Sequence, residues 1–218
     1  MRIIPPSAHI EGDIDGQALL KQIEAAGRTC YKSEDKIAEG SAEKFVATLI
    51  KRGHEAVIEH GAITVRFITD RGVTHEIVRH RLAAYCQEST RYCNYSKDQF
   101  DNEITCIVPT SIPDGSIMSQ IWCSAMTAAE DHYFALLKEG ATPQQARAVL
   151  PNSLKTELVM TANPREWRHF FKMRCAKAAH PDIRYVALKL LEEFHDRIPV
   201  LFDDIYEEYK GEIPDDLG

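Results

Sequence analysis

The 218-residue sequence predicts a single α+β domain, and three observations lead to this fold class. Several segments repeat apolar residues at helical spacing, and two others alternate apolar and polar residues as strands do. No internal repeat or low-complexity linker divides the chain. Because a chain of this length can bury one sizeable core, we expect one domain over residues 1–218.

The first half of the chain predicts helices, a strand and a loop. Apolar residues recur at helical spacing before Gly27, Ser41 begins a capping-like motif, and Val65 and Phe67 alternate with polar residues. The expected elements are a helix over 15–27, a helix from 41 to just before 53, a strand over 62–69, a helix over 72–84 and a polar, turn-rich binding loop over 86–103.

The second half contains more helix than strand. Thr142 followed by Pro143 is typical of a helix start, and Pro164 and Pro181 also suit a first helical position. The expected elements are a helix over 116–138, a helix from 142 to 150, a strand over 154–161, a helix over 164–174 and a helix over 181–196.

The composition limits the partners and the location. With 26 Lys and Arg against 33 Asp and Glu, the formal net charge is −7, so we expect no nucleic-acid partner. No apolar stretch approaches the roughly 20 residues that span a bilayer, and the amino terminus lacks a signal-peptide core. We therefore expect no membrane association and a cytoplasmic location, and six cysteines without a CxxC pair favour reduced thiols.

A metal site is not expected. His75 and Glu76, followed by His80, at first suggest the HExxH motif of metalloproteases. The two histidines are five positions apart, however, and the motif needs a spacing of four to place both imidazoles on one helical face.

The most informative motif is Arg79-His80-Arg81, followed after seven residues by Ser89-Thr90-Arg91-Tyr92. Arginine binds phosphate through a planar fork of donors and keeps its charge. Three fixed cations on an acidic body indicate a site for a small anionic ligand; the alternative is a solvated turn whose arginines pair with carboxylates. We expect Ser89 to bind a ligand, because no general base lies at a predictable position beside it.

A second group of polar residues accompanies the predicted helix over 164–174. Asn163 and Arg165 lie at its start, His169 one turn later, and Arg174 at its end. Helix starts favour anions, and an amide suits a ring edge that both donates and accepts. Taken alone, the pattern favours an Asn cap with surface arginines over a functional site.

Together these motifs resemble the flavin-dependent thymidylate synthases. The signature of that family is RHR, seven residues and then serine, extended by x-R-Y, which residues 79–92 reproduce. The resemblance covers residues from about 28 to 193, in the family's order. The other matching blocks are Cys30-Tyr31-x-Ser33, Gly53 to His60, Ala146 to Pro151, Asn163-x-Arg165 with His169, and Phe171 to Arg174.

The resemblance implies a mixed α/β domain with a central sheet flanked by helices, assembled as a homotetramer with shared active sites. It implies reductive methylation of deoxyuridylate (dUMP) to thymidylate (dTMP). Methylenetetrahydrofolate would supply the carbon, NADPH the reducing equivalents, and bound FAD the hydride chemistry, while the protein supplies position and electrostatics.

The resemblance also assigns ligands residue by residue. Arg174 is the expected catalytic residue, facing the uracil ring and stabilising the negative charge that develops there. FAD is expected to contact His54, Glu59, Arg79, His80, Arg81, Gln87, Asn163, Arg165 and His169. The dUMP ligands are expected to be Glu76, Arg79, Gln87, Glu88, Ser89, Thr90, Arg91, Arg147 and Arg174.

Three departures from the family pattern leave alternatives open. Ala56 and Ala84 stand where the family often has hydroxyl residues, and residues 178–182 diverge. A related flavoenzyme that modifies another pyrimidine nucleotide, for example by hydroxymethylation, is therefore a second hypothesis. A non-catalytic flavin- or nucleotide-binding protein is the third, and retention of Arg174 with a second anion site argues against it.

Overall fold

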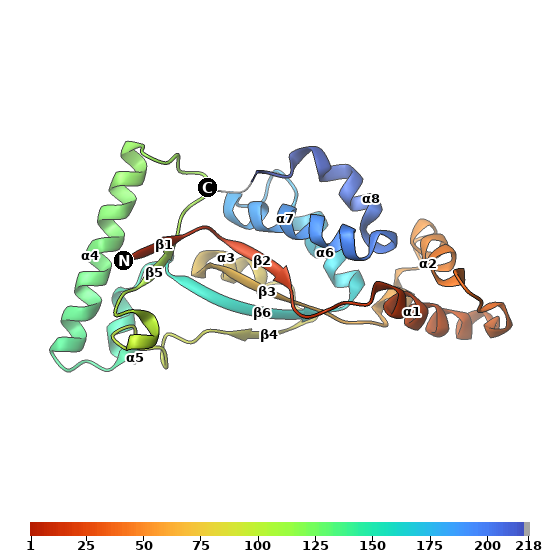
Figure 1. The fold of residues 1–218 in the computed structure, drawn as a ribbon, viewed down its shortest axis with the longest axis horizontal. Helices are drawn as coiled ribbons and strands as arrows, with labels where there is room; N and C mark the ends of the chain where they lie inside the picture. Colours follow the sequence, from red (N-terminus) through yellow and green to blue (C-terminus); the bar gives the residue numbers. More distant parts are fainter. Residues whose placement is uncertain (216–218) are drawn as a thin grey trace.

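A computed structural model describes residues 1–215, apart from the side chain of residue 99, and within them a four-stranded antiparallel sheet forms the centre of the fold (Figure 1). The strands are, in spatial order, β2 (Ser7–Ile10), β3 (Ile63–Asp70), β6 (Lys155–Ala162) and β4 (Ala83–Gln87). A separate parallel pair joins β1 (Arg2–Ile4) to β5 (Thr105–Ile107). The predicted domain of residues 1–218 extends over three residues outside the described range.

The register of the sheet determines which chain segments meet. At one end, Ala162 of β6 pairs with Ile63 of β3 and with Ala83 of β4. The residues before β3, before β4 and after β6 therefore come together at this end. At the other end, Lys155 of β6 pairs with Asp70 of β3.

One face of the sheet carries the main core. Alternate side chains of β3 and β6 are buried, and the helices above them in Figure 1 cover this face. These helices are α3 (Arg71–Ile77), α6 (Pro164–Arg174), α7 (Pro181–Arg197) and α8 (Pro199–Tyr209). Trp167, Phe171, Phe194 and Phe202 are fully buried among them and contact one another edge to face or at a tilt.

Further helices stand at the two ends of the sheet (Figure 1). One end carries α1 (Gly16–Tyr31) and α2 (Ser41–Lys51), and the other carries α4 (Ile117–Lys138) and α5 (Pro143–Ala146), near a second core around Tyr95 and Tyr133. Single 3₁₀ turns include η1 (Glu34–Lys36), η2 (Glu55–Glu59), η3 (Asp98–Phe100), η4 (Arg147–Val149) and η5 (Lys210–Glu212).

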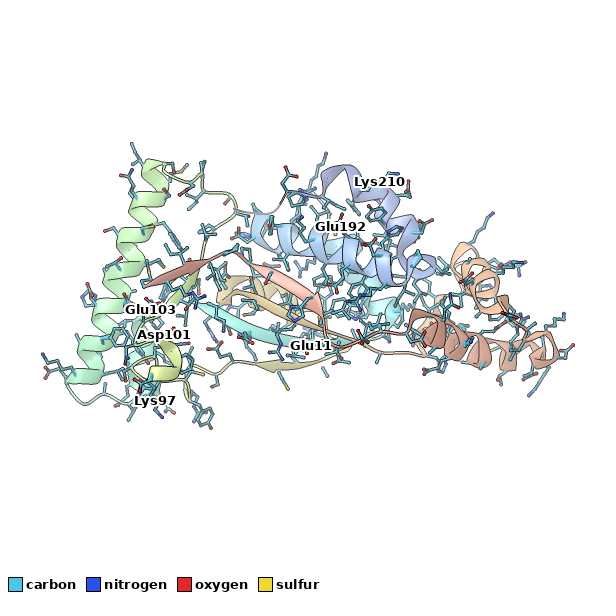
Figure 2. All side chains as sticks on the ribbon, in the orientation of Figure 1. Glu11, Lys97, Asp101, Glu103, Glu192 and Lys210 are labelled. Atoms are coloured by element: carbon cyan, nitrogen blue, oxygen red, sulfur yellow. The ribbon has the colours of Figure 1, made fainter. Side chains whose placement is uncertain are left out.

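Charged side chains extend outward from every part of the fold. Figure 2 labels Lys97, Asp101 and Glu103 near α5, and Glu192 and Lys210 on the outer helices. Among residues 1–215, no helix combines the length and apolarity that crossing a membrane requires.

Most predicted elements are confirmed within a few residues. The helices expected over 41–52, 116–138, 164–174 and 181–196 and the strands expected over 62–69 and 154–161 correspond to α2, α4, α6, α7, β3 and β6. Asn163 caps α6, as the alternative interpretation of this motif has it, because its side chain accepts a hydrogen bond from the amide of Glu166 at 2.9 Å.

The predicted helix over 72–84 is wrong in its second half. The helix α3 ends at Ile77, and Ala83–Gln87 pairs with β6 instead. The Tyr85 hydroxyl donates to the carbonyl of Ile77 at 3.0 Å and to that of His80, which fixes the chain reversal between α3 and β4. The RHR triplet thus lies in a connection, and the first two residues of the predicted loop over 86–103 belong to a strand.

Two helix ends also differ from the prediction. Gly27 does not end α1, which continues to Tyr31 and closes at Lys32 with a left-handed φ of 46°. A Cβ atom at Gly27 would lie 2.6 Å from a ring carbon of Phe45, so this glycine serves close packing. The helix predicted over 142–150 is α only to Ala146 and continues as η4.

Besides β4, three strands and one helix were not predicted, namely β1, β2, β5 and α8. The three strands have only three or four residues, too few to show alternation. Helix α8 follows α7 almost directly, since Ile198 caps the end of one and the start of the other.

We expect Phe194→Ala to lower the free energy of unfolding by about 3–5 kcal/mol, because it leaves a cavity among rings that the fold holds rigidly. Urea denaturation at fixed protein concentration measures the change. The matched control is Ile37→Ala, whose side chain is 48% exposed and whose effect should stay within about 0.5 kcal/mol. Equal effects at both positions would contradict the central role of this aromatic core.

Candidate active site

A cavity of about 440 Å³ opens at the sheet end where Ala162 pairs with Ile63 and Ala83. The register brings three separate segments there: η2 before β3, the RHR connection before β4, and the start of α6. We call this space the sheet-end cavity. Its lining residues are Glu55, Glu59, Leu82, Asn163, Arg165, Glu166, Arg168, His169 and Lys172.

The RHR triplet turns its middle residue inward and its outer residues outward. His80 is only 5% exposed, whereas Arg79 and Arg81 are both exposed. Within the described part of the chain, neither arginine forms an ion pair or a hydrogen bond through its side chain. Two unneutralised guanidinium groups therefore flank a buried imidazole, which favours binding of an anion.

Arg174, at the end of α6, is held by two of the other predicted residues. Its Nε donates to Nε2 of His80 at 3.0 Å, and its two terminal nitrogens donate to the carboxylate and the backbone carbonyl of Glu76 at 2.6 and 2.7 Å. The side chain is 11% exposed, so Arg174 is not a surface ion pair. Arginine has five N–H donors, so two remain for a ligand.

The contacts of His80 define its protonation. Because Arg174 donates to Nε2, the ring proton lies on Nδ1, which donates to Glu166 at 3.2 Å. Burial, and then the charge of Arg174, lowers the pKa of His80 to about 4, so the imidazole is neutral at pH 7. Burial also raises the pKa of Glu166 above its ordinary value.

His80, Glu166 and His169 also form a group that could ligate a metal, with donor atoms within 4.8 Å of one another. Both ring nitrogens of His80 are already in hydrogen bonds, one to Glu166 and one from Arg174. We therefore interpret the group as a hydrogen-bond network that orients Arg174.

Helix α6 contributes further predicted ligands to the sheet-end cavity. Arg165 donates to Glu59 at 2.5 Å and lies 3.7 Å from Glu55. His169, one turn later on the same helical face, meets the ring of His80 edge-on with centroids 5.6 Å apart. The structure thus brings together five of the predicted FAD ligands, namely Glu59, His80, Asn163, Arg165 and His169.

Two predicted FAD ligands lie elsewhere. His54 precedes η2 but faces α1, where its Nδ1 shares a 2.9 Å hydrogen bond with the Tyr31 hydroxyl. Gln87 lies at the opposite end of β4 from the RHR triplet, and its amide donates to the hydroxyls of Thr74 and Thr156 at 3.1 and 3.3 Å.

The remaining predicted dUMP ligands form a second group at the far end of β4. Arg147 donates to the buried hydroxyl of Thr90 at 3.3 Å, and the Ser89 hydroxyl accepts from the amide of Arg91 at 3.3 Å. Arg91 also donates to Gln144 at 3.0 Å. We call Ser89, Thr90, Arg91 and Arg147 the loop cluster. The length of β4 separates it from the RHR triplet within one chain.

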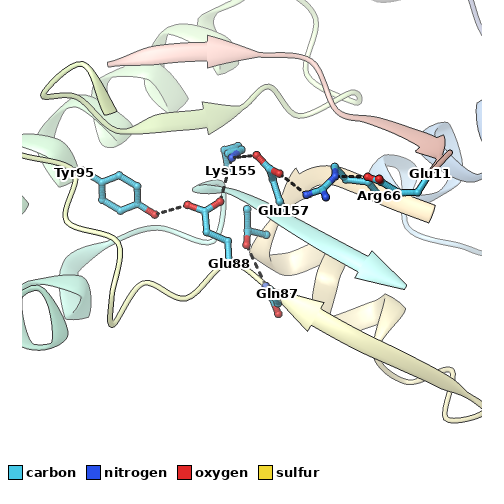
Figure 3. Close-up of polar contacts among 8 residues, drawn as sticks. Glu11, Arg66, Gln87, Glu88, Tyr95, Lys155 and Glu157 are labelled. Atoms are coloured by element: carbon cyan, nitrogen blue, oxygen red, sulfur yellow. Dashed lines mark hydrogen bonds and ion pairs between the residues drawn. The ribbon is translucent and has the colours of Figure 1, made fainter. Parts of the chain in front are cut away.

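Glu88 lies beside the loop cluster but takes part in a different network (Figure 3). It accepts from Lys155 at 3.1 Å, on the side of β4 away from Gln87. Hydrogen bonding to Lys155 is the main cause that lowers the pKa of Glu157. The network continues across the open face of the sheet through Glu157 and Arg66 to Glu11. The other carboxylate oxygen of Glu88 accepts from the Tyr95 hydroxyl at 3.5 Å.

Sequence analysis missed several residues of the site. Glu166 stands three positions after the cap of α6, where an acidic residue is ordinary for a helix start, and its partner His80 is 86 positions away. No local pattern links them. Glu55, Leu82 and Lys172 line the sheet-end cavity, and Gln144 supports Arg91.

Comparisons with known proteins place this geometry in a family. Residues 17–200 match the family described as thymidylate synthase complementing protein. The flavin-dependent thymidylate synthase of Geobacter sulfurreducens is 34% identical over 186 residues, covering 82% of this chain and 78% of that protein. The enzyme of the same name from Mycolicibacterium vanbaalenii is 35% identical over 219 residues, covering 92% and 84%. The chain therefore belongs to the family of flavin-dependent thymidylate synthases.

A solved structure shares the fold. The UMP/dUMP methylase PolB from Streptomyces cacaoi, bound with 5-Br dUMP, superposes with a TM-score of 0.74 over 95% of this chain and 97% of that one. The two sequences are only 22% identical, so this structural similarity shows a shared fold and nothing more.

The buried neutral His80 predicts a pH dependence of stability. Its pKa is about 4 in the folded protein and near 6.5 in the unfolded chain, so between these values only the unfolded chain takes up the proton. Above pH 6.5, His80 therefore does not change the free energy of unfolding. As the pH drops from 6.5 to 4, His80 lowers this free energy by about 3 kcal/mol. We expect His80→Gln to remove this pH-dependent loss of the free energy of unfolding.

Urea denaturation at pH 7, 5.5 and 4.5 measures the effect as the difference between wild type and variant. His60→Gln, at an exposed histidine, is the matched control. It should leave the slope of the free energy of unfolding against pH as it is in the wild type. A wild-type slope that persists in His80→Gln would show that folding does not lower the pKa of His80.

Proposed function

We propose that this chain is an FAD-dependent methyltransferase that converts dUMP to dTMP, with methylenetetrahydrofolate as the carbon donor and NADPH as the reductant. Family membership over residues 17–200 supports the reaction. The observation that carries the proposal is Arg174, a nearly buried guanidinium that Glu76 and His80 hold with donors to spare.

The residues at the sheet end suit FAD. A dinucleotide needs cations for its diphosphate, and Arg79 and Arg81 are exposed there and have no partner among the described residues. It also needs apolar surface and amide groups for its ring, which Leu82, at 72% exposure, and Asn163 provide. FAD, when bound, would supply the redox chemistry between NADPH and the new methyl group.

The chain's own contribution is to hold and polarise the nucleotide. The two free donors of Arg174 match an imide edge and would stabilise negative charge on the pyrimidine ring, an effect worth about 3–4 kcal/mol for one donor elsewhere. Glu76 fixes the guanidinium in place, and the neutral imidazole of His80 does so without adding a competing positive charge.

The loop cluster would bind the phosphate of dUMP through Ser89, Arg91 and Arg147. Five residues of β4 span roughly 13 Å, so this cluster and the RHR triplet are far apart for one small nucleotide within a single chain. We therefore include a homotetramer in the proposal, in which one chain supplies the sheet-end cavity and another the loop cluster. A cytoplasmic location is also part of it.

The purified protein should be yellow, contain FAD, and form dTMP only when dUMP, methylenetetrahydrofolate and NADPH are all present. The absorbance spectrum and chromatography with mass detection check both statements. UMP is tested in parallel, because the similar solved structure carries the name of a UMP/dUMP methylase. Absence of FAD from a folded protein, or a 5-hydroxymethyl product instead of dTMP, would contradict the proposal.

Arg174→Ala should keep FAD and NADPH oxidation while dTMP formation falls about 100- to 1,000-fold, because the lost interaction acts mainly in the transition state. Arg174→Lys should recover only part of the rate, since lysine keeps the charge but not the planar fork. Arg197→Ala, at a surface arginine paired with Glu193, is the control and should retain full activity. A near wild-type rate for Arg174→Ala would remove Arg174 from the chemistry.

A further inference from the structure

A second cavity, of about 500 Å³, lies between α1 and α2 at the end of the molecule (Figure 1). We call it the hairpin cleft. Four cationic side chains line it, and no carboxylate does. Its lining residues are Arg28, Tyr31, Ser33, Lys36, Ser41, Lys44, Phe45, Thr48, Leu49 and Arg52.

Most of the positive charge in the hairpin cleft is unpaired. Arg28 forms an ion pair with Glu24 at 2.8 Å and lies over the ring of Phe45 at 4.2 Å. Among the described residues, Lys36, Lys44 and Arg52 have no carboxylate partner. In a protein of net charge −7, a concave group of unpaired cations concentrates positive potential and attracts anions.

A serine with no side-chain hydrogen bond among the described residues also lines the cleft. Ser33 is 8% exposed, lines the cleft, and its side chain neither caps the following turn nor forms another hydrogen bond among the described residues. The Ser41 hydroxyl, by contrast, is occupied by Glu24 and the carbonyl of Ala38. The hydroxyl of Ser33 can therefore donate a hydrogen bond to a ligand in the cleft or accept one from it.

The hairpin cleft adjoins the candidate active site. Tyr31, at its edge, shares a 2.9 Å hydrogen bond with His54. The next residue, Glu55, begins η2 and lines the sheet-end cavity. A molecule long enough to pass His54 would therefore place one end beside the flavin site and the other in the cleft.

We propose that the hairpin cleft binds the anionic glutamyl tail of the folate carbon donor, an inference that rests on the proposed function. Lys44 and Thr48 share one face of α2, and Arg52 follows it, so the cations extend over about 12 Å. A row of this length fits a tail with several separate carboxylates better than one compact phosphate. The phosphate of NADPH is the other source of the same chemistry.

The test compares wild type with Lys44→Ala/Arg52→Ala in steady-state kinetics and direct binding. The KM for methylenetetrahydrofolate carrying several glutamyl groups should rise about tenfold, and the KM for dUMP and for NADPH should change less than twofold. With methylenetetrahydropteroate, which lacks glutamate, wild type and variant should not differ. Lys21→Ala/Lys51→Ala, at exposed lysines outside the cleft, should match wild type.

Direct binding separates this inference from the proposed function. Equilibrium dialysis of pteroyl-polyglutamate against the FAD-loaded protein needs no turnover, whereas dTMP formation by wild type tests the reaction itself. Equal folate affinity in wild type and the double variant, with an intact circular dichroism spectrum, would overturn the assignment. A rise in the KM for NADPH alone would also overturn it and identify the NADPH phosphate as the occupant.

Discussion

The pairing of Ala162 with both Ile63 and Ala83 is the constraint on which the candidate site depends. It gathers the end of η2, the RHR connection and the start of α6 at one edge of the sheet. The buried side chains fix this register, because a slip of one residue would turn Phe67 and Met160 out of the core. The site is thus positioned by the same apolar contacts that stabilise the sheet.

The charged residues near this end of the sheet have two different roles. Glu76 and Arg174 are paired next to a neutral imidazole, and burying an unpaired charge there would be costly. Arg79 and Arg81 are exposed and form no ion pair within residues 1–215, so their charge is available to an anion. Within the RHR triplet, the middle residue faces inward and contacts Arg174, while the two outer residues face outward.

The sequence predicted α6 well because its signals are local: Asn163 caps the helix, Pro164 suits its first turn, and Arg165 and His169 share a face. It did not predict the end of α3, because pairing of β4 with β6 and the hydroxyl of Tyr85 are long-range competitors of a continuous helix. Nor could it predict Glu166 as the partner of His80, since that contact exists only in the folded chain.

The sheet joins segments that are distant along the chain. The hydroxyls of Thr64 and Thr161, for example, meet at 2.8 Å across 97 positions. During synthesis, the RHR connection leaves the ribosome long before β6 is made. Until then, the strand that positions its arginines is absent. Loop closure over such distances also slows folding. A chain truncated before β6 would contain Arg79 and Arg81 but lack Arg165, Arg168, Lys172 and Arg174, and it would have no binding site.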